Sequence, residues 1–331
     1  MPDRLDAYRR KRDAKRTPEP VPSGSPAPSR GDTFVVQQHH ARSLHWDLRL
    51  ERDGVLVSWA VPRGIPRDPD RNHLAVHTED HPMEYATFHG EIPAGEYGAG
   101  RMTIYDRGTY ATEKWRDDEV IVVFDGAKVS GRYVLFRTGG KRGNDWMIHR
   151  MDPLPAGWTR MPEGLSPAEA TPAKRLPADD GAYAFELHWP GQRAFAAVSG
   201  GRLDLRADGT REITSEYPAL RAMAESLAPT ECLLDGVVVA FHRVPVYMAF
   251  DLLWHNGEST VDEPYAARRE RLLALELAGT HWQTPPHFAG GGAFARDTAR
   301  EQGLPGVIAK RLDAPYGAGD WRAIPAGPRR H

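Results

Sequence analysis

The chain has 331 residues, a formal net charge of −2 at pH 7, 40% hydrophobic residues and 27% charged residues. These values are typical of soluble globular proteins, and the length is sufficient for two ordinary domains. The sequence contains no run of about 18 apolar residues that could span a bilayer, and its charged N-terminus lacks the apolar core of a secretory signal. The single cysteine, Cys232, excludes an internal disulfide and cysteine-rich zinc sites and favours a reducing cytoplasm.

The first 30 residues form a basic N-terminal arm, in which Arg and Lys outnumber Asp and Glu and whose later part is rich in Pro and Ser. Such a composition buries little apolar surface, so we expect the arm to be mobile, at least in its Pro/Ser part. A basic arm is usually a solvated tail, and otherwise it contacts phosphates or an acidic surface.

Residues 31–152 have the pattern of a mainly β domain. Short apolar or alternating runs predict strands at 34–37, 44–50, 102–105, 120–124, 133–136 and 146–148. Gly139 and Gly140 separate the last two runs and predict a hairpin. Short strands at regular spacing, with few helical stretches, indicate an antiparallel sandwich or barrel.

Residues 153–180 contain six prolines among small and charged residues, and we interpret them as a linker. The remaining residues, 181–331, combine predicted strands with predicted helices. Strand-like runs at 182–187, 232–241 and 246–253 alternate with helical runs at 219–227 and 265–277, which predicts a second domain of the α+β class.

Histidine is concentrated in one stretch, because seven of the 14 histidines lie between residues 39 and 89. Within the predicted strand at residues 44–50, His45, Asp47 and Arg49 point to one face, and the apolar residues point to the other. His39 could supply a third ligand from a neighbouring turn. Two imidazoles and a carboxylate suit a divalent metal such as manganese, iron or zinc, and the Arg49 guanidinium could hold a phosphate oxygen. The alternative is a structural role for these histidines.

A second polar segment, residues 79–85, contains a proline and is expected to be a loop. There His81 could protonate a leaving oxygen or pair with a phosphate, and Tyr85 could hydrogen-bond the same group. The following segment, residues 90–100, is dense in glycine, but no Gly-Lys-Ser/Thr follows, so it is not a P-loop. This segment favours a tight corner between two strands.

Six segments occur in an order that identifies a relative: 10–13, 17–20, 34–50, 74–76, 79–85 and 92–100. Together they make residues 9–152 resemble the 3′-phosphoesterase domain of bacterial DNA ligase D, the multifunctional end-joining ligase. The resemblance implies a compact antiparallel β-barrel and a manganese-dependent enzyme that trims 3′ ends. In that family the enzyme removes a terminal ribonucleoside and then the remaining 3′-phosphate, leaving a 3′-hydroxyl.

The resemblance also implies roles for individual residues. The metal, Mn²⁺ or another divalent ion, would be held by His39, His45 and Asp47. The catalytic set would be His45, Asp47, Arg49, His81 and Tyr85, the last three at the scissile phosphate, with His81 also a candidate general acid. Positions that support substrate binding would be Arg12, Asp13, Glu19, Gln37, Arg49 and Glu79. His73 stands where the family often has a basic residue, so substrate affinity is expected to be weaker or pH-dependent.

Residues 182–322 resemble the adenylation domain of ATP-dependent DNA ligases in segments 186–193, 234–240, 249–254 and 306–312. This resemblance implies a nucleotidyltransferase-like α+β fold. The family's chemistry needs Lys-x-Asp-Gly, whose lysine attacks ATP to form a lysyl-adenylate. Four positions depart from the family's lysine, aspartate and two glutamates, in that order: His188, Pro190, Val237 and Pro305.

These departures predict a truncated, degenerate domain that does not use ATP. Arg193, Asp235 and Lys310 remain from the family pattern. Arg193 and Lys310 could still contact phosphates, although exposed Arg and Lys usually serve solubility alone. A histidine can form a phosphoramidate, so His188 stays open as an alternative nucleophile.

Three functions remain open from the sequence. The first is a metal-dependent 3′-end-processing phosphoesterase in double-strand break repair, with an inactive ligase-like module. The second is an ATP-dependent ligase that still seals nicks, and the third is a non-catalytic end-joining scaffold. The expected partners are 3′ ends of DNA or RNA-tipped DNA and end-joining proteins such as a separate ligase or an end-binding protein. We expect no membrane association, and a location in the cytoplasm near the nucleoid.

Overall fold

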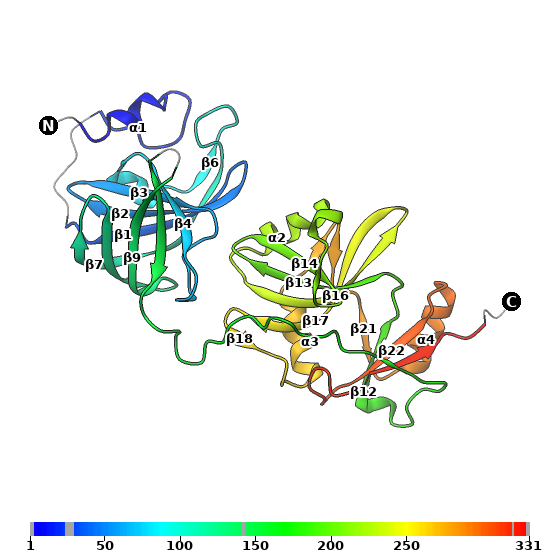
Figure 1. Cartoon of the computed structure of the whole chain (residues 1–331). Coiled ribbons are helices and arrows are strands. Elements are labelled where there is room, and N and C mark those ends of the chain that lie inside the picture. The colour runs from blue at the N-terminus through cyan, green and yellow to red at the C-terminus, as the bar shows by residue number, and fades with distance from the viewer. Residues whose placement is uncertain (1–2, 24–29, 141–142, 320, 329–331) are drawn as a thin grey trace. The chain divides into compact units, whose positions relative to one another are not determined.

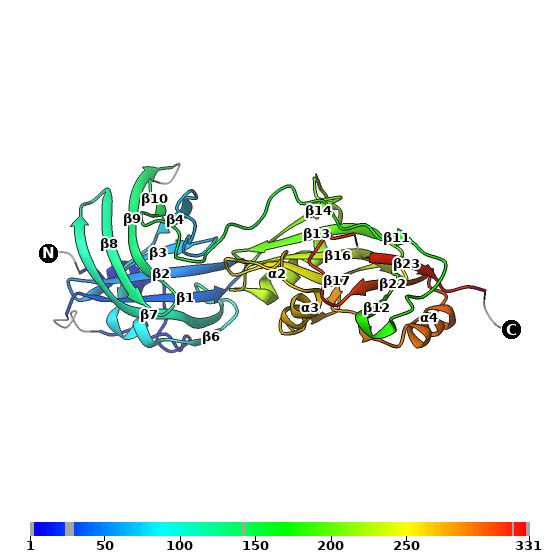
Figure 2. The same ribbon diagram turned by 90° about the horizontal axis from the view of Figure 1, so that it is seen from below.

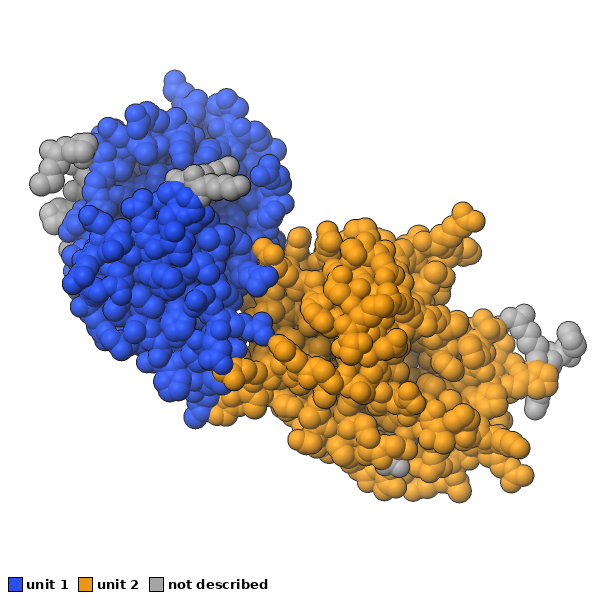
Figure 3. Space-filling model, in the orientation of Figure 1, with its two compact units in different colours: residues 1–156 blue, residues 157–331 orange. Residues whose placement is uncertain are grey.

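The computed structural model describes residues 3–23, 30–140, 143–319 and 321–328. The chain forms two compact units, residues 1–156 and 157–331 (Figure 3). The Pro/Ser part of the predicted mobile arm, residues 24–29, lies outside the described residues. No helix among the described residues is long and apolar enough to cross a membrane.

Unit 1 is built on a closed antiparallel barrel, as the sequence predicted (Figure 1). Its strands follow the order β1-β2-β3-β4-β10-β9-β8-β7, and pairing of β7 with β1 closes the ring. The barrel strands are β1 (Thr33–His40), β2 (Leu44–Arg52), β3 (Val55–Val61), β4 (His73–His77), β7 (Gly100–Trp115), β8 (Glu119–Gly126), β9 (Ser130–Gly139) and β10 (Asp145–Arg150).

The alternation of the strands decides which side chains fill the barrel. Phe34 and Trp59 belong to the inner faces, where Phe34 contacts Phe124 and Trp59 contacts Trp146. Between β2 and β3, the left-handed pair Asp53 and Gly54 makes a two-residue turn that fixes the hairpin register. This register determines which residues of β2 lie on the outer face.

The outer face of β1 to β3 is covered by segments that precede and follow the barrel strands. They are α1 (Asp6–Arg10), β5 (His81–Pro82), the 3₁₀ helix Met83–Thr87 and β6 (Gly90–Ile92). Tyr8, Tyr85 and Ile92 from these segments form a hydrophobic cluster with Leu56 and Met102. The described arm is therefore partly packed onto the domain, because Tyr8 is fully buried, whereas residues 13–16 are exposed.

The described residues of unit 2 form two sheets and three α-helices, in agreement with the predicted α+β class. One sheet has the order β11 (Thr171–Pro172), β23 (Trp321–Pro325), β22 (Gly306–Arg311), β12 (Tyr183–Leu187) and β21 (His287–Ala289). The other has the order β15 (Arg211–Glu212), β14 (Arg202–Ala207), β13 (Gln192–Ser199), β16 (Cys232–Phe241), β17 (Val244–His255), β20 (Trp282–Gln283) and β19 (Ala278–Gly279), with β18 (Glu258–Ser259) paired to β17.

The helices of unit 2 pack against these sheets. They are α2 (Arg221–Leu227), α3 (Tyr265–Leu273) and α4 (Gly292–Glu301). Helix α3 packs along β17, and α4 packs along β12 and β22 (Figure 2). Buried Ala295 and Ala299 give α4 a small apolar face, which lets it approach the sheet closely.

Much of the predicted linker, residues 153–180, packs within unit 2. Trp158 contacts the ring of Trp254, Ala168 is buried, and β11 pairs in parallel with β23. The prolines here accompany an extended chain that lies against the sheets, because an extended edge segment tolerates missing N–H donors. The boundary between the two units lies between residues 156 and 157.

Candidate metal and phosphate site

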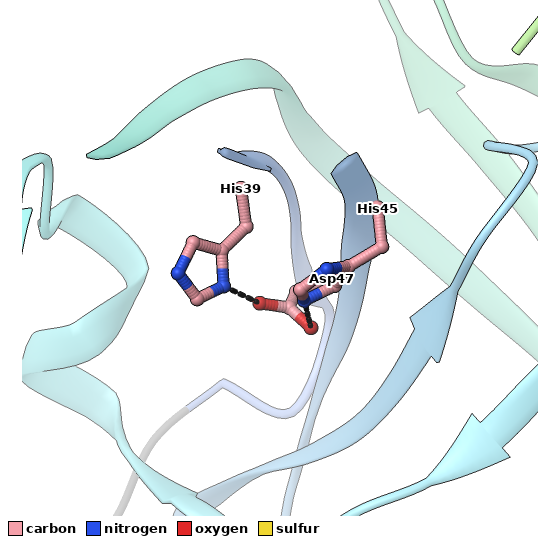
Figure 4. Close-up of side chains that lie close together, drawn as sticks. All are labelled: His39, His45 and Asp47. Carbon is pink, nitrogen blue, oxygen red and sulfur yellow. Dashed lines mark ion pairs between the residues drawn. The ribbon is translucent and has the colours of Figure 1, made fainter. Parts of the chain in front are cut away.

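The β1–β2 hairpin brings His39, His45 and Asp47 together (Figure 4). His39 is the direct ladder partner of His45, and Asp47 follows on the same face of β2. His39 Nδ1 lies 3.7 Å from Asp47 Oδ2, and His45 Nε2 lies 3.7 Å from Asp47 Oδ1. One donor atom of each residue lies within 4.8 Å of the other two. This arrangement can place two nitrogens and a carboxylate around one ion.

The second nitrogen of each imidazole is held by a backbone carbonyl. His39 Nε2 lies 2.9 Å from the Gly98 oxygen, and His45 Nδ1 lies 3.0 Å from the Ser43 oxygen. Because a carbonyl oxygen can only accept, these two nitrogens carry the proton, and in a neutral ring the nitrogens facing Asp47 carry a lone pair. Such carbonyl partners orient the histidines of metal sites. The donor set and its orientation fit a divalent transition metal.

Arg49 is a buried cation whose position is fixed from three sides. Its Nη2 donates to Asp47 Oδ2 at 3.0 Å, its Nη1 to Ser58 Oγ at 2.9 Å, and its Nε to Gln37 Oε1 at 2.7 Å. The amide of Gln37 in turn donates to the carbonyls of Tyr85 and Phe88. The guanidinium therefore lies beside the candidate metal ligands in a fixed orientation, as recognition of a phosphate requires.

His81 and Tyr85 are positioned by residues of the N-terminal arm. Arg12 donates to Glu19 Oε1 at 2.8 Å and to Glu79 Oε1 at 3.0 Å, and its Nη2 lies 3.4 Å from His81 Nε2. The Tyr85 hydroxyl donates to Glu19 Oε1 at 2.9 Å. His81 Nδ1 lies 2.8 Å from the Glu79 carbonyl oxygen and therefore carries the proton, so the Nε2 lone pair faces the Arg12 guanidinium.

Burial and neighbouring charges set the protonation of these groups. Burial raises the pKa of Asp47, but the Arg49 guanidinium outweighs this effect and holds the pKa below its ordinary value. Burial, together with the Arg49 and Arg12 guanidinium groups, lowers the pKa of His81 well below its usual value. Asp47 is therefore an anion and His81 a neutral imidazole at neutral pH.

Nine of the sequence-predicted residues line one cavity of about 230 Å³: Arg12, Glu19, His39, His45, Asp47, Arg49, Glu79, His81 and Tyr85. Gln37 lies behind Arg49, as described above. Asp13 and His73 are not among the lining residues. The Asp13 carboxylate accepts a bond from the Lys15 N–H, and His73 Nδ1 bonds the Gly64 carbonyl at 2.7 Å. The role of His73 in place of a basic residue at the substrate stays a prediction.

Seven other residues line the cavity and were not predicted as site residues, and two of them, Tyr97 and Gly98, are neighbours in the sequence. They lie in the glycine-dense segment between β6 and β7, where Gly98 has the left-handed φ of 77°. The segment is a corner between strands, as predicted, and it also supplies the carbonyl that orients His39. The only sequence signal was the density of glycine, which indicates a turn without indicating what its backbone contacts.

The three residues that remain from the ligase pattern, Arg193, Asp235 and Lys310, all form ion pairs within unit 2. Arg193 donates to both oxygens of Asp235 at 2.6 and 2.5 Å, and Tyr316 donates to the same carboxylate at 2.6 Å. Lys310 is fully buried, with its Nζ 2.8 Å from Glu186 Oε2. The view of Lys310 as an exposed, solubilising residue is therefore wrong, and burial lowers its pKa in spite of Glu186.

The four positions that depart from the ligase pattern differ in their surroundings. Val237 is buried in a cluster with Phe250 and Trp321, where a carboxylate would lose its hydration. His188 and Pro305 line a cavity of about 430 Å³ together with Lys174. Partial burial lowers the pKa of His188. Pro190 is exposed, just before β13.

Comparisons with known proteins identify a family match and several relatives of this chain. Residues 37–137 match the family described as DNA Ligase D 3′-phosphoesterase domain. The chain is 45% identical to the multifunctional non-homologous end joining DNA repair protein LigD of Mycobacterium tuberculosis, over 96% of this chain and 44% of the relative. It is 32% identical to LigD of Pseudomonas aeruginosa, over 99% of this chain and 49% of the relative.

A solved structure of mycobacterial DNA ligase D complexed with ATP and MES matches 49% of this chain and 60% of that chain, at 33% identity and a TM-score of 0.44. The chain spans less than half the length of the curated LigD relatives given above. The chain is therefore a homologue of LigD over nearly its whole length, and its residues 37–137 are a DNA ligase D 3′-phosphoesterase domain.

Proposed function

We propose that unit 1 is a manganese-dependent 3′-phosphoesterase that acts on DNA and RNA-tipped DNA ends in double-strand break repair. It would remove a terminal ribonucleoside and then the 3′-phosphate. The observation that carries the proposal is the pair of backbone carbonyls, of Gly98 and Ser43, that direct one nitrogen each of His39 and His45 toward Asp47. A purely structural role for these histidines would not require both rings to converge on one carboxylate.

The residues around this triad supply the rest of the chemistry. A divalent ion held by the triad would polarise a phosphoryl oxygen and an attacking water. Arg49, fixed by Gln37 and Ser58, would stabilise the negative charge that develops on the transferring phosphoryl group. The guanidinium has five N–H groups, and three of them serve the bonds described above, so the other two can serve a phosphate oxygen.

His81 is suited to donate a proton to the leaving oxygen of the substrate. Its Nδ1 stays on the Glu79 carbonyl, so Nε2 is the atom that gains and loses a proton. The free imidazole is neutral, but an incoming phosphate dianion favours its charged form. His81 would therefore take up a proton when the substrate binds and donate it to the leaving oxygen, which is the 5′-oxygen of the ribonucleoside in the first step and the 3′-oxygen in the second.

We also propose that unit 2 does not adenylate and that ATP is not a cofactor. Two features support this: His188 occupies the lysine position, and Val237 lies among apolar side chains where the family has a glutamate. Sealing would then fall to a separate ligase, with the processed end as the shared partner. A second candidate, nick sealing by this chain, is favoured by its 45% identity to LigD and would require His188 to act as the nucleophile.

One assay in two arms tests both proposals. The protein and Mn²⁺ are incubated with a primer–template that ends in a ribonucleotide or a 3′-phosphate, and in parallel with labelled ATP. Trimming to a 3′-hydroxyl without labelling of the protein is the expected result. An absence of trimming would refute the first proposal, and a covalent adenylate on the protein would refute the second.

A further inference from the structure

Tyr97 places an exposed aromatic ring at the edge of the catalytic cavity. It lines the cavity together with the metal and phosphate residues. Tyr97 is 49% exposed, although the large aromatic ring of a tyrosine is usually buried for the most part in a folded domain. Among the described residues of unit 1, the other large exposed apolar side chains are Leu74 and Met151, which are not aromatic and do not line the cavity.

The ring is exposed but held in place. Lys11 Nζ donates to the Tyr97 hydroxyl at 3.2 Å and to Glu79 Oε2 at 2.9 Å, and it lies 4.5 Å from the centre of the ring. The next residue, Gly98, is held through its carbonyl by His39. An aromatic side chain that is already ordered loses little conformational entropy when a ligand packs on it.

The surroundings of the ring indicate what would pack there. Arg12 lies over the ring at 5.4 Å from its centre, and Lys11 adds a second cation over the ring at 4.5 Å. Cations that border an exposed aromatic ring form the combination that binds single-stranded nucleic acid, with phosphates on the cations and a base stacked on the ring. A small anion such as free phosphate would use the cations and leave the ring unoccupied.

We propose that Tyr97 is a stacking platform for a nucleobase next to the scissile phosphate. It is a substrate-positioning residue that gives this site affinity for a nucleotide end over free phosphate. The inference rests on the proposed function, because that function supplies the scissile phosphate. Stacking is insensitive to base identity, since every base has a π-face, so the platform would accept ends of any sequence.

The test measures binding without turnover. Fluorescently labelled primer–templates with a 3′-phosphate, carrying either a normal or an abasic last nucleotide, are titrated in chelator with the full chain. Removal of a stacking partner is expected to weaken binding roughly 5- to 100-fold. Tyr97→Leu should show this loss on the normal end, whereas Tyr97→Phe, which keeps the ring and loses the hydroxyl, should bind like the wild type.

The abasic end distinguishes stacking from a structural role. In the wild type, loss of the base should weaken binding by a similar factor, and in Tyr97→Leu this base dependence should disappear. Leu74→Ala is the matched control and should retain wild-type binding. Equal losses in Tyr97→Phe and Tyr97→Leu, or an unchanged base dependence in Tyr97→Leu, would overturn the inference. A wild type that binds ends with this base dependence but never trims them would refute the proposed function and leave the stacking platform intact.

Discussion

The guanidinium of Arg49 illustrates how one residue serves both folding and chemistry. It is buried, yet its charge is matched by Asp47 and its N–H groups by Gln37 and Ser58. An Arg presents its donors in a rigid plane, whereas a Lys presents one flexible ammonium group. The three partners lie in different directions around the guanidinium, so charge alone cannot replace it.

We therefore expect Arg49→Lys to lose nearly as much phosphoesterase activity as Arg49→Ala. Gln37 and Ser58 would also lose a donor, at a cost of about 1–3 kcal/mol for each buried group left unsatisfied. Rates of phosphate release and thermal unfolding of both variants check this. Substantially wild-type rates for Arg49→Lys would mean that the site needs only a positive charge.

At the scale of single residues, the sequence identifies candidate site residues better than it identifies the groups to which they hydrogen-bond. The alternation of β2 and the family resemblance were enough to select His39, His45 and Asp47. They could not indicate which ring nitrogen is protonated, because the Gly98 carbonyl arrives from a segment 59 residues away. For the same reason the pairing of Lys310 with Glu186 was not foreseen, since it depends on the register between β12 and β22.

At the scale of elements, the corner between β6 and β7 supports the candidate metal ligand His39 through the Gly98 carbonyl. Gly100 opens β7 with a φ of 138°, a value that L side chains rarely adopt. A Cβ at this position would overlap the carbonyl oxygen of His40, which adjoins His39. Gly95 lies in the same corner with φ of 94°, and a Cβ there would meet open space.

These two glycines form a matched pair for a prediction. Gly100→Ala is expected to destabilise unit 1 by about 1–3 kcal/mol through overpacking and to weaken Mn²⁺ binding by displacing the corner. Gly95→Ala should cost only its local backbone strain. Denaturant unfolding and Mn²⁺ titration of both variants measure the difference. Equal effects in both would show that the corner does not constrain the ligands.

A second element-scale prediction concerns the altered ligase positions. His188→Lys alone should not restore labelling by ATP, because Val237 remains among apolar side chains and Lys310 remains paired with Glu186. Labelled ATP incubated with this variant and with the wild type provides the measurement. Formation of a covalent adenylate on His188→Lys would show that unit 2 lacks only its nucleophile.

At the scale of the whole molecule, the fold class could be predicted and the limits of the packed regions could not. Strand spacing indicated an antiparallel sandwich or barrel, the family resemblance implied the barrel, and mixed periodicity indicated the α+β unit. Composition suggested a solvated arm and a linker, yet Tyr8 anchors the arm and Ala168 anchors the segment before β11. One or two buried side chains are enough to fix an extended segment, and overall composition does not reveal them.

The molecule as a whole is expected to lose stability in mild acid. Burial lowers the pKa of five histidines, which in the unfolded chain return to about 6.5: His77, His81, His188, His255 and His287. Between each lowered pKa and 6.5 the unfolded chain binds more protons than the folded chain, so the free energy of unfolding falls as the pH drops below about 6.5.

Urea unfolding in chelator at about pH 7.5 and about pH 5.5 measures this loss, because the second pH is still above the ordinary pKa of the carboxylates. The unfolding midpoint should be lower at the acidic pH, and His81→Asn should reduce the difference. His149→Asn, a change at a partly exposed position on β10, is the control and should leave the difference unchanged. A midpoint that is independent of pH would contradict the expected proton uptake on unfolding.

His45→Ala tests most directly whether the β1–β2 hairpin holds the proposed catalytic metal. His45 is partly exposed, and its bond outside the triad goes to the backbone of Ser43, so its removal should leave the fold intact. The measurement is Mn²⁺-dependent release of phosphate from a 3′-phosphate primer–template, with His89→Ala as the matched control. The account predicts that His45→Ala stays folded and releases no phosphate, while His89→Ala matches the wild type. Full Mn²⁺-dependent release by His45→Ala would contradict it.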